Sequence, residues 1–253
     1  MALKKVIYLN KKEGETPLEA LEDFRSKNKK YKDLKVTYAG RLDPMASGLL
    51  LLLVDDKIKE KEDYLKLDKE YIFDVLFGFS TDTYDILGKV EHSHILKNVR
   101  MSGLEEKIKD NLKSFTGKFI QKYPAYSSKT VKGKQLFSYA REGIEVEIPT
   151  REVFIKSFKF LKIRKISHKS LLENIEKRIK KVKGDFRQKE IIQTWRQNLT
   201  GNNQFYIASF KIKCSSGTYV RSLSHNLGGK MGVPALAFSI KRTKIGNWSK
   251  ILK

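Results

Sequence analysis

The feature that most constrains the fold of this chain is a run of six consecutive aliphatic residues, Leu49–Val54. An apolar run of this length suits a strand that is buried on both faces, and it is far shorter than the roughly 20 residues that cross a membrane. Gly40, Pro44 and Gly48, which precede the run, are typical of a tight loop. The sequence therefore predicts a buried strand that carries a constrained loop at its start, over residues 38–48.

That loop presents one carboxylate, Asp43, which is the only acidic residue between Asp33 and Asp55. A loop at the end of a buried strand is a place where a rigid fold can present a reactive side chain. An Asp-Pro pair is also common in turns, where the Asp side chain caps the backbone. Spacing alone leaves both interpretations of Asp43 open, a catalytic carboxylate and a turn-capping residue.

Two helices are predicted by capping signals. Thr16 and Glu19 have the spacing of a capping box, as do Ser102 and Glu105. Apolar residues at helical spacing follow both boxes, and Gly117 is expected to end the second helix.

Further strands and one more helix are expected from apolar patterning. Lys4–Leu9 and Tyr71–Phe77 read as strands, and apolar residues alternate with Lys over Phe210–Cys214, which suits a half-buried strand. Thr218–Leu227 is predicted to be a helix, with Gly228 as its stop. Strands and helices are interspersed without a regular strand–helix–strand repeat, so a single mixed α/β domain is expected.

The charge of the chain indicates a polyanionic partner. Lys and Arg number 52 against 29 Asp and Glu, a net charge of +23. Nucleic acid is the obvious counterpart, an anionic membrane is a less favoured one, and a solvated Lys-rich surface is the alternative explanation. The single Cys214 and the absence of an apolar N-terminal stretch fit a cytoplasmic protein.

Two basic stretches stand apart from the rest. Residues 113–141 hold seven cations and no acidic residue, with aromatic residues among them. This pattern suits either an RNA contact or a basic loop whose aromatic rings anchor it to the core. Residues 162–203 hold twelve cations and four acidic residues, and their apolar spacing predicts a broken helix or a helical hairpin packed on the main domain.

The segment from Gly40 to Leu50, read as Gly-Arg-Leu-Asp-Pro-Met-Ala-Ser-Gly-Leu-Leu, resembles the catalytic motif of pseudouridine synthases. It is most similar to that of the TruB family, the tRNA pseudouridine-55 synthases, although Gly-Arg-Leu-Asp also resembles the RsuA and RluA synthases, which modify mostly ribosomal RNA. Four further segments resemble the TruB family in the same order along the chain. They are Lys69–Tyr71, Thr81–Gly88, Gln121–Gly143 and Cys214–Leu223.

The resemblance implies one pseudouridine synthase-type catalytic domain over residues 1–253, built around a mostly antiparallel sheet. It also implies an RNA-gripping basic thumb loop at about 121–151, and it leaves a helical basic insertion at about 163–203. Few residues follow Trp248, so the PUA-type RNA-binding domain of many relatives is expected to be absent. The net charge of residues 162–203 suggests that the insertion supplies additional grip on RNA.

The same resemblance assigns catalytic roles. Asp43 matches the catalytic carboxylate, which acts as nucleophile or as base, and Arg221 matches the arginine that pairs with it. Tyr71 matches the tyrosine that stacks on the target base. Without the resemblance, Tyr71 is equally read as a core residue of a strand and Arg221 as a surface residue of a helix.

Substrate contacts are implied as well. Asp85 matches a polar residue that contacts the flipped nucleotide, Ile240 stands where the family has a leucine in the uracil pocket, and Tyr38 replaces a family histidine. A flipped base must leave its stack, and basic and aromatic contacts offset that cost. The full set of expected RNA-binding residues is Tyr38, Asp85, Lys129, Lys134, Arg141, Tyr219, Ile240 and Arg242.

No cofactor and no metal are expected, because the reaction of this family only rearranges bonds and because His92 and His94 have no third metal ligand nearby in the sequence. The expected partner is RNA, above all tRNA, with no membrane and no obligate protein partner, and the protein is expected to act as a monomer. Two alternatives remain at this point. One is the same reaction on another RNA such as rRNA, and the other is a non-catalytic RNA chaperone.

Overall fold

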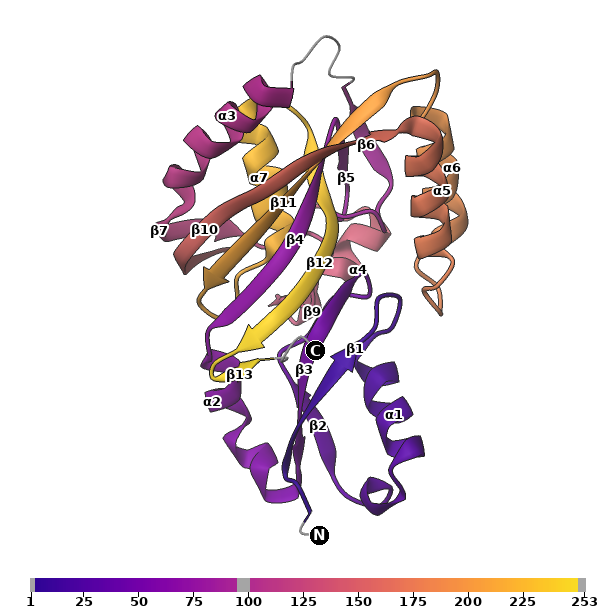
Figure 1. Cartoon of the computed structure of the whole chain (residues 1–253). Helices are drawn as coiled ribbons and strands as arrows, with labels where there is room; N and C mark the ends of the chain where they lie inside the picture. The colour runs from indigo at the N-terminus through magenta and orange to yellow at the C-terminus, as the bar shows by residue number, and fades with distance from the viewer. Residues whose placement is uncertain (1–2, 95–100, 250–253) are drawn as a thin grey trace.

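The computed structural model describes residues 3–94 and 101–249. These ranges contain thirteen strands and seven α-helices, interspersed without a regular alternation (Figure 1). The strands are β1 (Val6–Lys11), β2 (Val36–Ala39), β3 (Ala46–Val54), β4 (Lys69–Phe77), β5 (Phe79–Thr81), β6 (Val90–Ser93), β7 (Gly117–Lys122), β8 (Thr130–Val131), β9 (Lys134–Gln135), β10 (Thr150–Ser167), β11 (Gln204–Cys214), β12 (Ala235–Ile245) and β13 (Trp248–Ser249). The helices are α1 (Pro17–Lys27), α2 (Lys61–Lys66), α3 (Met101–Leu112), α4 (Leu136–Glu142), α5 (His168–Ile179), α6 (Gln188–Asn198) and α7 (Val220–Met231).

A nine-stranded sheet forms the centre of the molecule. Seven of its strands run in the order β1-β3-β12-β4-β11-β10-β7, while β2 pairs with β3 and β13 with β12. The pairing of β3 with β12 is parallel, and the other pairings within this sheet are antiparallel. The predicted mixed α/β fold around a mostly antiparallel sheet is therefore confirmed.

The aliphatic run forms the buried part of β3, as the sequence predicts. Residues Leu50–Val54 have no exposed surface, since β1 and β2 pair with this half of the strand and α1 and α2 flank it. At its start, Gly48 has φ +104°, and a Cβ atom at this position would lie 2.2 Å from the Arg242 carbonyl oxygen. Only glycine permits this approach, so Gly48 lets the loop before β3 pack against β12.

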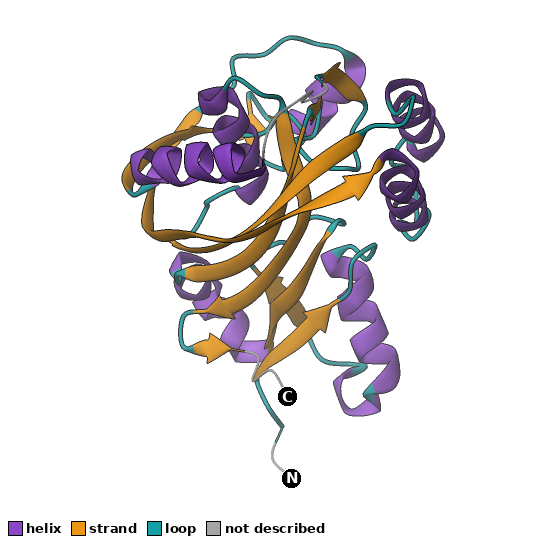
Figure 2. Cartoon of the chain, turned by 45° about the horizontal axis from the view of Figure 1, so that its top comes forward, coloured by secondary structure: helices purple, strands orange, loops and turns teal. Residues whose placement is uncertain are grey.

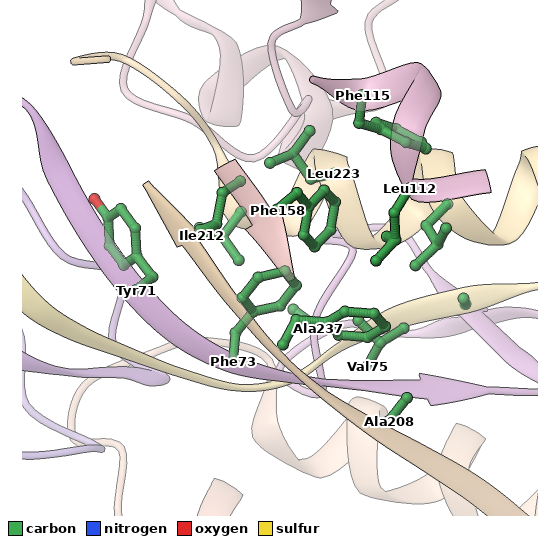
Figure 3. Packing of buried hydrophobic residues seen from close by; sticks show 14 of the residues in the cluster. Tyr71, Phe73, Val75, Leu112, Phe115, Phe158, Ala208, Ile212, Leu223 and Ala237 are labelled. Carbon is green, nitrogen blue, oxygen red and sulfur yellow. The ribbon is translucent and has the colours of Figure 1, made fainter. Parts of the chain in front are cut away.

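One face of the sheet is covered by α3 and α7. Alternate residues of β4, namely Tyr71, Phe73, Val75 and Phe77, belong to the core under these helices. Figure 3 shows Tyr71 at the end of this row, with its hydroxyl turned away from the packed rings. The face that builds the core therefore continues directly into a polar aromatic residue.

The opposite face is covered by α5 and α6, which lie side by side (Figures 1 and 2). Trp195 of α6 is fully buried in a second core, together with residues of α5, β4, β11 and β12. The predicted helical hairpin is present, but residues 163–167 belong to the long strand β10 rather than to a helical segment. Because the hairpin buries a core of its own, it is an integral part of the fold.

The capping box of Thr16 and Glu19 at α1 is confirmed: the Thr16 hydroxyl accepts from the Glu19 N–H, and the Glu19 carboxylate accepts from the Thr16 N–H. The second capping box is wrong, because Ser102 lies inside α3. That helix ends at Leu112 and continues only as a 3₁₀ turn, so it does not reach Gly117.

The predicted stop at Gly228 is also wrong, because α7 continues to Met231 and ends at Gly232, which has φ +68°. Gly228 serves close packing instead: a Cβ atom there would lie 2.5 Å from the Val233 carbonyl oxygen. The glycine is therefore required by the chain that follows the helix rather than by the end of the helix.

Within the two described ranges, none of the helices is long and apolar enough to cross a membrane. The same ranges contain no cluster of three or more His, Cys, Asp or Glu side chains that could hold a metal ion.

Candidate active site

A cavity of about 960 Å³ opens where the loop before β3, strand β4, the loop after β5, residues 126–128 and the N-terminus of α7 meet. Eight cationic residues and three carboxylates line it, so the cavity attracts anions. Its aromatic residues can stack on a planar ring. They are Tyr38, Tyr71, Tyr126, Phe137, Phe186 and Tyr219.

Asp43 and Arg221 form a two-pronged ion pair in this cavity. The Arg221 Nε donates to Asp43 Oδ2 at 2.7 Å, and its Nη2 donates to Oδ1 at 3.1 Å. The Arg221 side chain is 3% exposed, whereas the Asp43 side chain is 37% exposed. The carboxylate therefore meets the cavity while its partner is held behind it, as a planar guanidinium can do and an ammonium cannot.

The position of Arg221 follows from the local structure at the start of α7. Gln121 of β7 accepts the Tyr219 N–H at 2.8 Å and donates to the Tyr219 carbonyl at 3.0 Å, so a side chain from another strand fixes the first turn. The Arg221 guanidinium also donates to the carbonyls of Thr83 at 2.6 Å and Tyr126 at 3.2 Å. Burial alone would lower the pKa of Arg221, but Asp43 and Asp85 raise it above its usual value.

Arg242 holds the loop that carries Asp43. Its guanidinium donates to the carbonyls of Leu49 at 2.7 Å, Gly40 at 3.0 Å and Arg41 at 3.3 Å, which lie on both sides of Asp43 in the sequence. Arg242 is 2% exposed. Its hydrogen bonds to main-chain carbonyls make it a structural support of the loop, and its side chain faces the protein rather than solvent.

The turn before α1 supports the loop from its other side. The Gly14 N–H donates to the Pro44 carbonyl at 2.8 Å. Lys11 is fully buried and donates to the carbonyls of Glu15 at 2.5 Å and Lys12 at 2.9 Å. Burial lowers the pKa of Lys11 to about 8. The residue next to Asp43 is therefore held by a turn that a buried lysine closes.

Tyr71 and Ile240 form an apolar side of the cavity. Both line it and both are nearly buried, at 8% and 7% exposure. Burial raises the pKa of the Tyr71 hydroxyl, although nearby Arg242 opposes this. Tyr71 is therefore a neutral phenol at physiological pH, with a ring and a proton donor facing the same cavity.

Asp85 is a second carboxylate near Arg221. It is 5% exposed, and it accepts from the Thr83 hydroxyl at 2.8 Å and from the Leu87 N–H at 2.9 Å. Its Oδ2 lies 3.8 Å from the Arg221 Nε. Burial raises the pKa of Asp85 to about 6, against the opposing effect of Arg221. The cavity thus holds one exposed and one buried carboxylate around a single guanidinium.

The structure brings most of the residues expected to bind RNA to the cavity. Tyr38, Asp85, Arg141, Tyr219 and Ile240 line it, and so does Arg242 as described above. Lys129 and Lys134 are not among the lining residues. Their ammonium groups lie over the rings of Tyr123 and Tyr139, and Lys134 also pairs with Glu142.

Several lining residues were not singled out by the sequence reasoning. Thr83 and Tyr126 lie within segments that resemble the TruB family, but only their carbonyl oxygens contact Arg221. Phe186 continues the helical apolar spacing of residues 171–182 in the sequence, but the structure places it with Arg187 in the loop between α5 and α6, where both line the cavity. A main-chain contact leaves no signal in side-chain type, so these positions could be found only from the structure.

Comparison with known proteins assigns the class. Residues 27–184 match the family described as "TruB family pseudouridylate synthase (N terminal domain)". Among solved structures, a chain of the "Crystal Structure of a Cbf5-Nop10-Gar1 Complex" superposes with a TM-score of 0.57 at 19% identity, over 97% of this chain and 50% of that one. The fold and the carboxylate–arginine cavity therefore define a pseudouridylate synthase-type domain.

The particular family follows from sequence relatives. The chain is 32% identical to "tRNA pseudouridine synthase B" of Caldicellulosiruptor saccharolyticus over 84% of its own length and 58% of that protein. It is 31% identical to the protein of the same name from Protochlamydia amoebophila, over 96% of its own length and 75% of the relative. The chain belongs to the TruB family.

Proposed function

We propose that this protein is an RNA isomerase that converts a uridine in the T-arm of tRNA, position 55, to pseudouridine. The observation that carries the proposal is the Asp43–Arg221 pair at the wall of a cavity lined by cations and aromatic rings. Such a cavity attracts the phosphate backbone and offers stacking surfaces for an extruded base. The proposed enzyme is cytoplasmic and works without a cofactor or an obligate protein partner.

The reaction breaks the bond between C1′ of the ribose and N1 of uracil, turns the base, and joins C1′ to C5. The proton on C5 is released and N1 gains a proton, so the product is an isomer of the substrate. An ionised Asp43 serves this chemistry in either of two ways, as nucleophile at C1′ or as base toward a proton of the sugar. Arg221 binds and orients both carboxylate oxygens.

The remaining residues divide into two roles. Tyr71 and Ile240 enclose the uracil ring, and the Tyr71 hydroxyl is available for a proton transfer. Asp85, when ionised, can accept the N3–H of uracil, which distinguishes uracil from cytosine. Tyr38, Arg141 and Tyr219 contact the RNA around the extruded nucleotide.

The choice of tRNA is supported by the relatives, which are named tRNA pseudouridine synthase B. This chain covers 58% of the first of them, so substrate choice is tested directly rather than inferred from the name. Ribosomal RNA is a less favoured substrate, because these relatives are named for tRNA. A non-catalytic chaperone role is also less favoured, because a pure RNA binder has no use for a buried guanidinium bound to a half-exposed carboxylate.

The test is pseudouridine mapping of unmodified tRNA after incubation with the purified protein. Wild type is expected to modify one T-arm uridine, and Asp43→Asn is expected to lose activity by at least about 10⁴-fold while still binding tRNA. A ribosomal RNA fragment is the comparison substrate. Modification of that fragment alone would overturn the tRNA assignment, and full activity of Asp43→Asn would overturn the catalytic one.

A further inference from the structure

Arg187 lies in the loop between α5 and α6, and its side chain reaches the wall of the cavity. Its Nη1 donates to Asp82 Oδ2 at 2.8 Å, with both side chains less than one-fifth exposed. The same guanidinium lies 4.4 Å from the centre of the Tyr126 ring. Arg187 therefore joins two segments that are distant in sequence, the loop after β5 and the segment after β7.

The backbone of this loop is built to aim Arg187. The residue has φ +60°, a conformation that residues other than glycine seldom adopt. Its N–H donates to Asp185 Oδ1 at 3.1 Å, and the Gln188 side chain accepts the Phe186 N–H at 2.9 Å. These hydrogen bonds hold an unfavourable conformation in place, and its result is a guanidinium directed at the cavity.

The two segments that Arg187 joins are the ones that hold Arg221. One Arg221 nitrogen donates to the carbonyl of Thr83, the residue after Asp82, and another donates to the carbonyl of Tyr126 itself. A displacement of either segment would therefore move a carbonyl that orients the Arg221 guanidinium. Because Arg221 binds both oxygens of Asp43, the displacement would be passed on to the catalytic carboxylate.

We propose that Arg187 is a positioning residue for the Asp43–Arg221 pair, acting through Asp82 and Tyr126. The proposal rests on the proposed function, since the pair matters for rate only if it carries the reaction. It assigns the helical hairpin α5–α6 a part in catalysis: the hairpin supplies the residue that holds together the two segments whose carbonyls accept from Arg221. A direct contact of Arg187 with an RNA phosphate is the competing role, and the two differ in what they do to rate and to affinity.

The test compares variants in single-turnover reactions with tRNA transcript. Arg187→Gln is expected to lower the rate constant at saturating enzyme by about 10- to 100-fold, with the Kd for tRNA changed by less than about threefold. Asp82→Asn is expected to lower the rate constant by a similar factor, although the loss of a negative charge would by itself favour the binding of RNA. Arg187→Lys keeps the charge but lacks the planar group that stacks on Tyr126, so partial activity is expected.

Arg196→Gln is the matched control. Arg196 lies on the same hairpin and pairs with Glu176 at 2.7 Å, but it is exposed and does not line the cavity. Its loss is expected to leave the rate constant unchanged. In Arg187→Gln, weaker binding of tRNA with an unchanged rate constant would overturn the proposal and identify an RNA contact. In Asp82→Asn, a faster or unchanged reaction would also overturn the proposal.

A second measurement does not depend on activity. Hydrogen exchange of the Arg221 Nε–H, followed by NMR, reports how firmly this group is bound to Asp43. Exchange is expected to be at least about tenfold faster in Arg187→Gln and Asp82→Asn than in wild type or Arg196→Gln. Unchanged exchange in both variants would overturn the proposal. Faster exchange in a protein whose wild type forms no pseudouridine on any RNA would instead show that the proposed function has failed while the positioning contact stands.

Discussion

Two buried arginines flank the loop that carries Asp43, and they do different work. Arg221 and Arg242 are 3% and 2% exposed. Arg221 binds the two oxygens of Asp43 and two carbonyls from other segments, whereas Arg242 donates to the carbonyls of three residues around the loop itself. One arginine orients the carboxylate that we propose to react, and the other shapes the backbone that presents it.

This comparison explains why residue type alone could not distinguish the roles of Arg221 and Arg242. Arg242 was expected to bind RNA, as one of the substrate contacts given with the family resemblance. The structure turns its guanidinium to Gly40, Arg41 and Leu49 instead. These main-chain contacts give Arg242 a structural role, and a contact of Arg242 with RNA stays a prediction.

The sharpest way to break the comparison is Arg221→Lys. We expect the single-turnover rate on tRNA to fall by at least about 10³-fold, equivalent to roughly 4 kcal/mol, because an ammonium cannot bind both oxygens of Asp43 and two carbonyls at once. The melting temperature is measured in parallel. Activity within tenfold of wild type would show that the two-pronged geometry at Asp43 is not needed for the reaction.

Arg242→Met tests the other half of the comparison. The substitution keeps most of the side-chain volume but leaves the buried Leu49 carbonyl and the partly buried carbonyls of Gly40 and Arg41 without this donor, so the free energy of unfolding is expected to fall by roughly 3 kcal/mol. Urea denaturation measures this. At a temperature where the variant is folded, its affinity for tRNA is expected to be unchanged. Weaker tRNA binding without a loss of stability would restore the role of Arg242 as an RNA contact.

Much of the fold and the centre of the candidate site could be predicted from the sequence. Local signals predicted the buried strand β3, the capped start of α1 and the helical hairpin, because each depends on residues close together in the chain. The glycine signals failed at Gly117 and Gly228, where strand geometry and close packing decide the residue rather than a helix end.

What escaped the sequence is contact through the main chain. Asp43 and Arg221 were paired only because two segments resembled one family, and the structure then placed their side chains within hydrogen-bonding distance. No pattern of side-chain types indicates that the carbonyls of Thr83 and Tyr126 accept from Arg221, or that Arg187 joins those two segments. Such contacts depend on the packing of the whole molecule, so they are visible only once it is folded.

The smallest expected effect concerns the second carboxylate beside Arg221. Burial raises the pKa of Asp85 to about 6 from its usual 3.8. Between these two pH values, the carboxyl of Asp85 therefore keeps its proton in the folded protein but releases it in the unfolded chain. The stability that this proton confers is fully present below about pH 4 and is lost as the pH rises through about 6. We therefore expect the free energy of unfolding of wild type, relative to Asp85→Asn, to fall by roughly 2 kcal/mol between pH 4 and 7.

Denaturation of both proteins at several pH values gives this difference directly, and subtracting the variant removes the titration of carboxylates that lie elsewhere. Arg242 donates to three main-chain carbonyls, and the pKa of Asp85 is shifted by other groups, so Arg242→Met should leave the pH dependence between pH 4 and 7 as it is in wild type. Arg221→Lys should change it, because the positive charge that opposes the rise in the pKa of Asp85 would lie at a different distance from that carboxylate on a lysine than on the guanidinium. If the two arginine variants shifted the curve equally, the division of work between Arg221 and Arg242 would not hold. If only Arg221→Lys shifts it, the pKa of Asp85 depends on the charge at Arg221 and not on Arg242, which supports the loop without taking part in the titration.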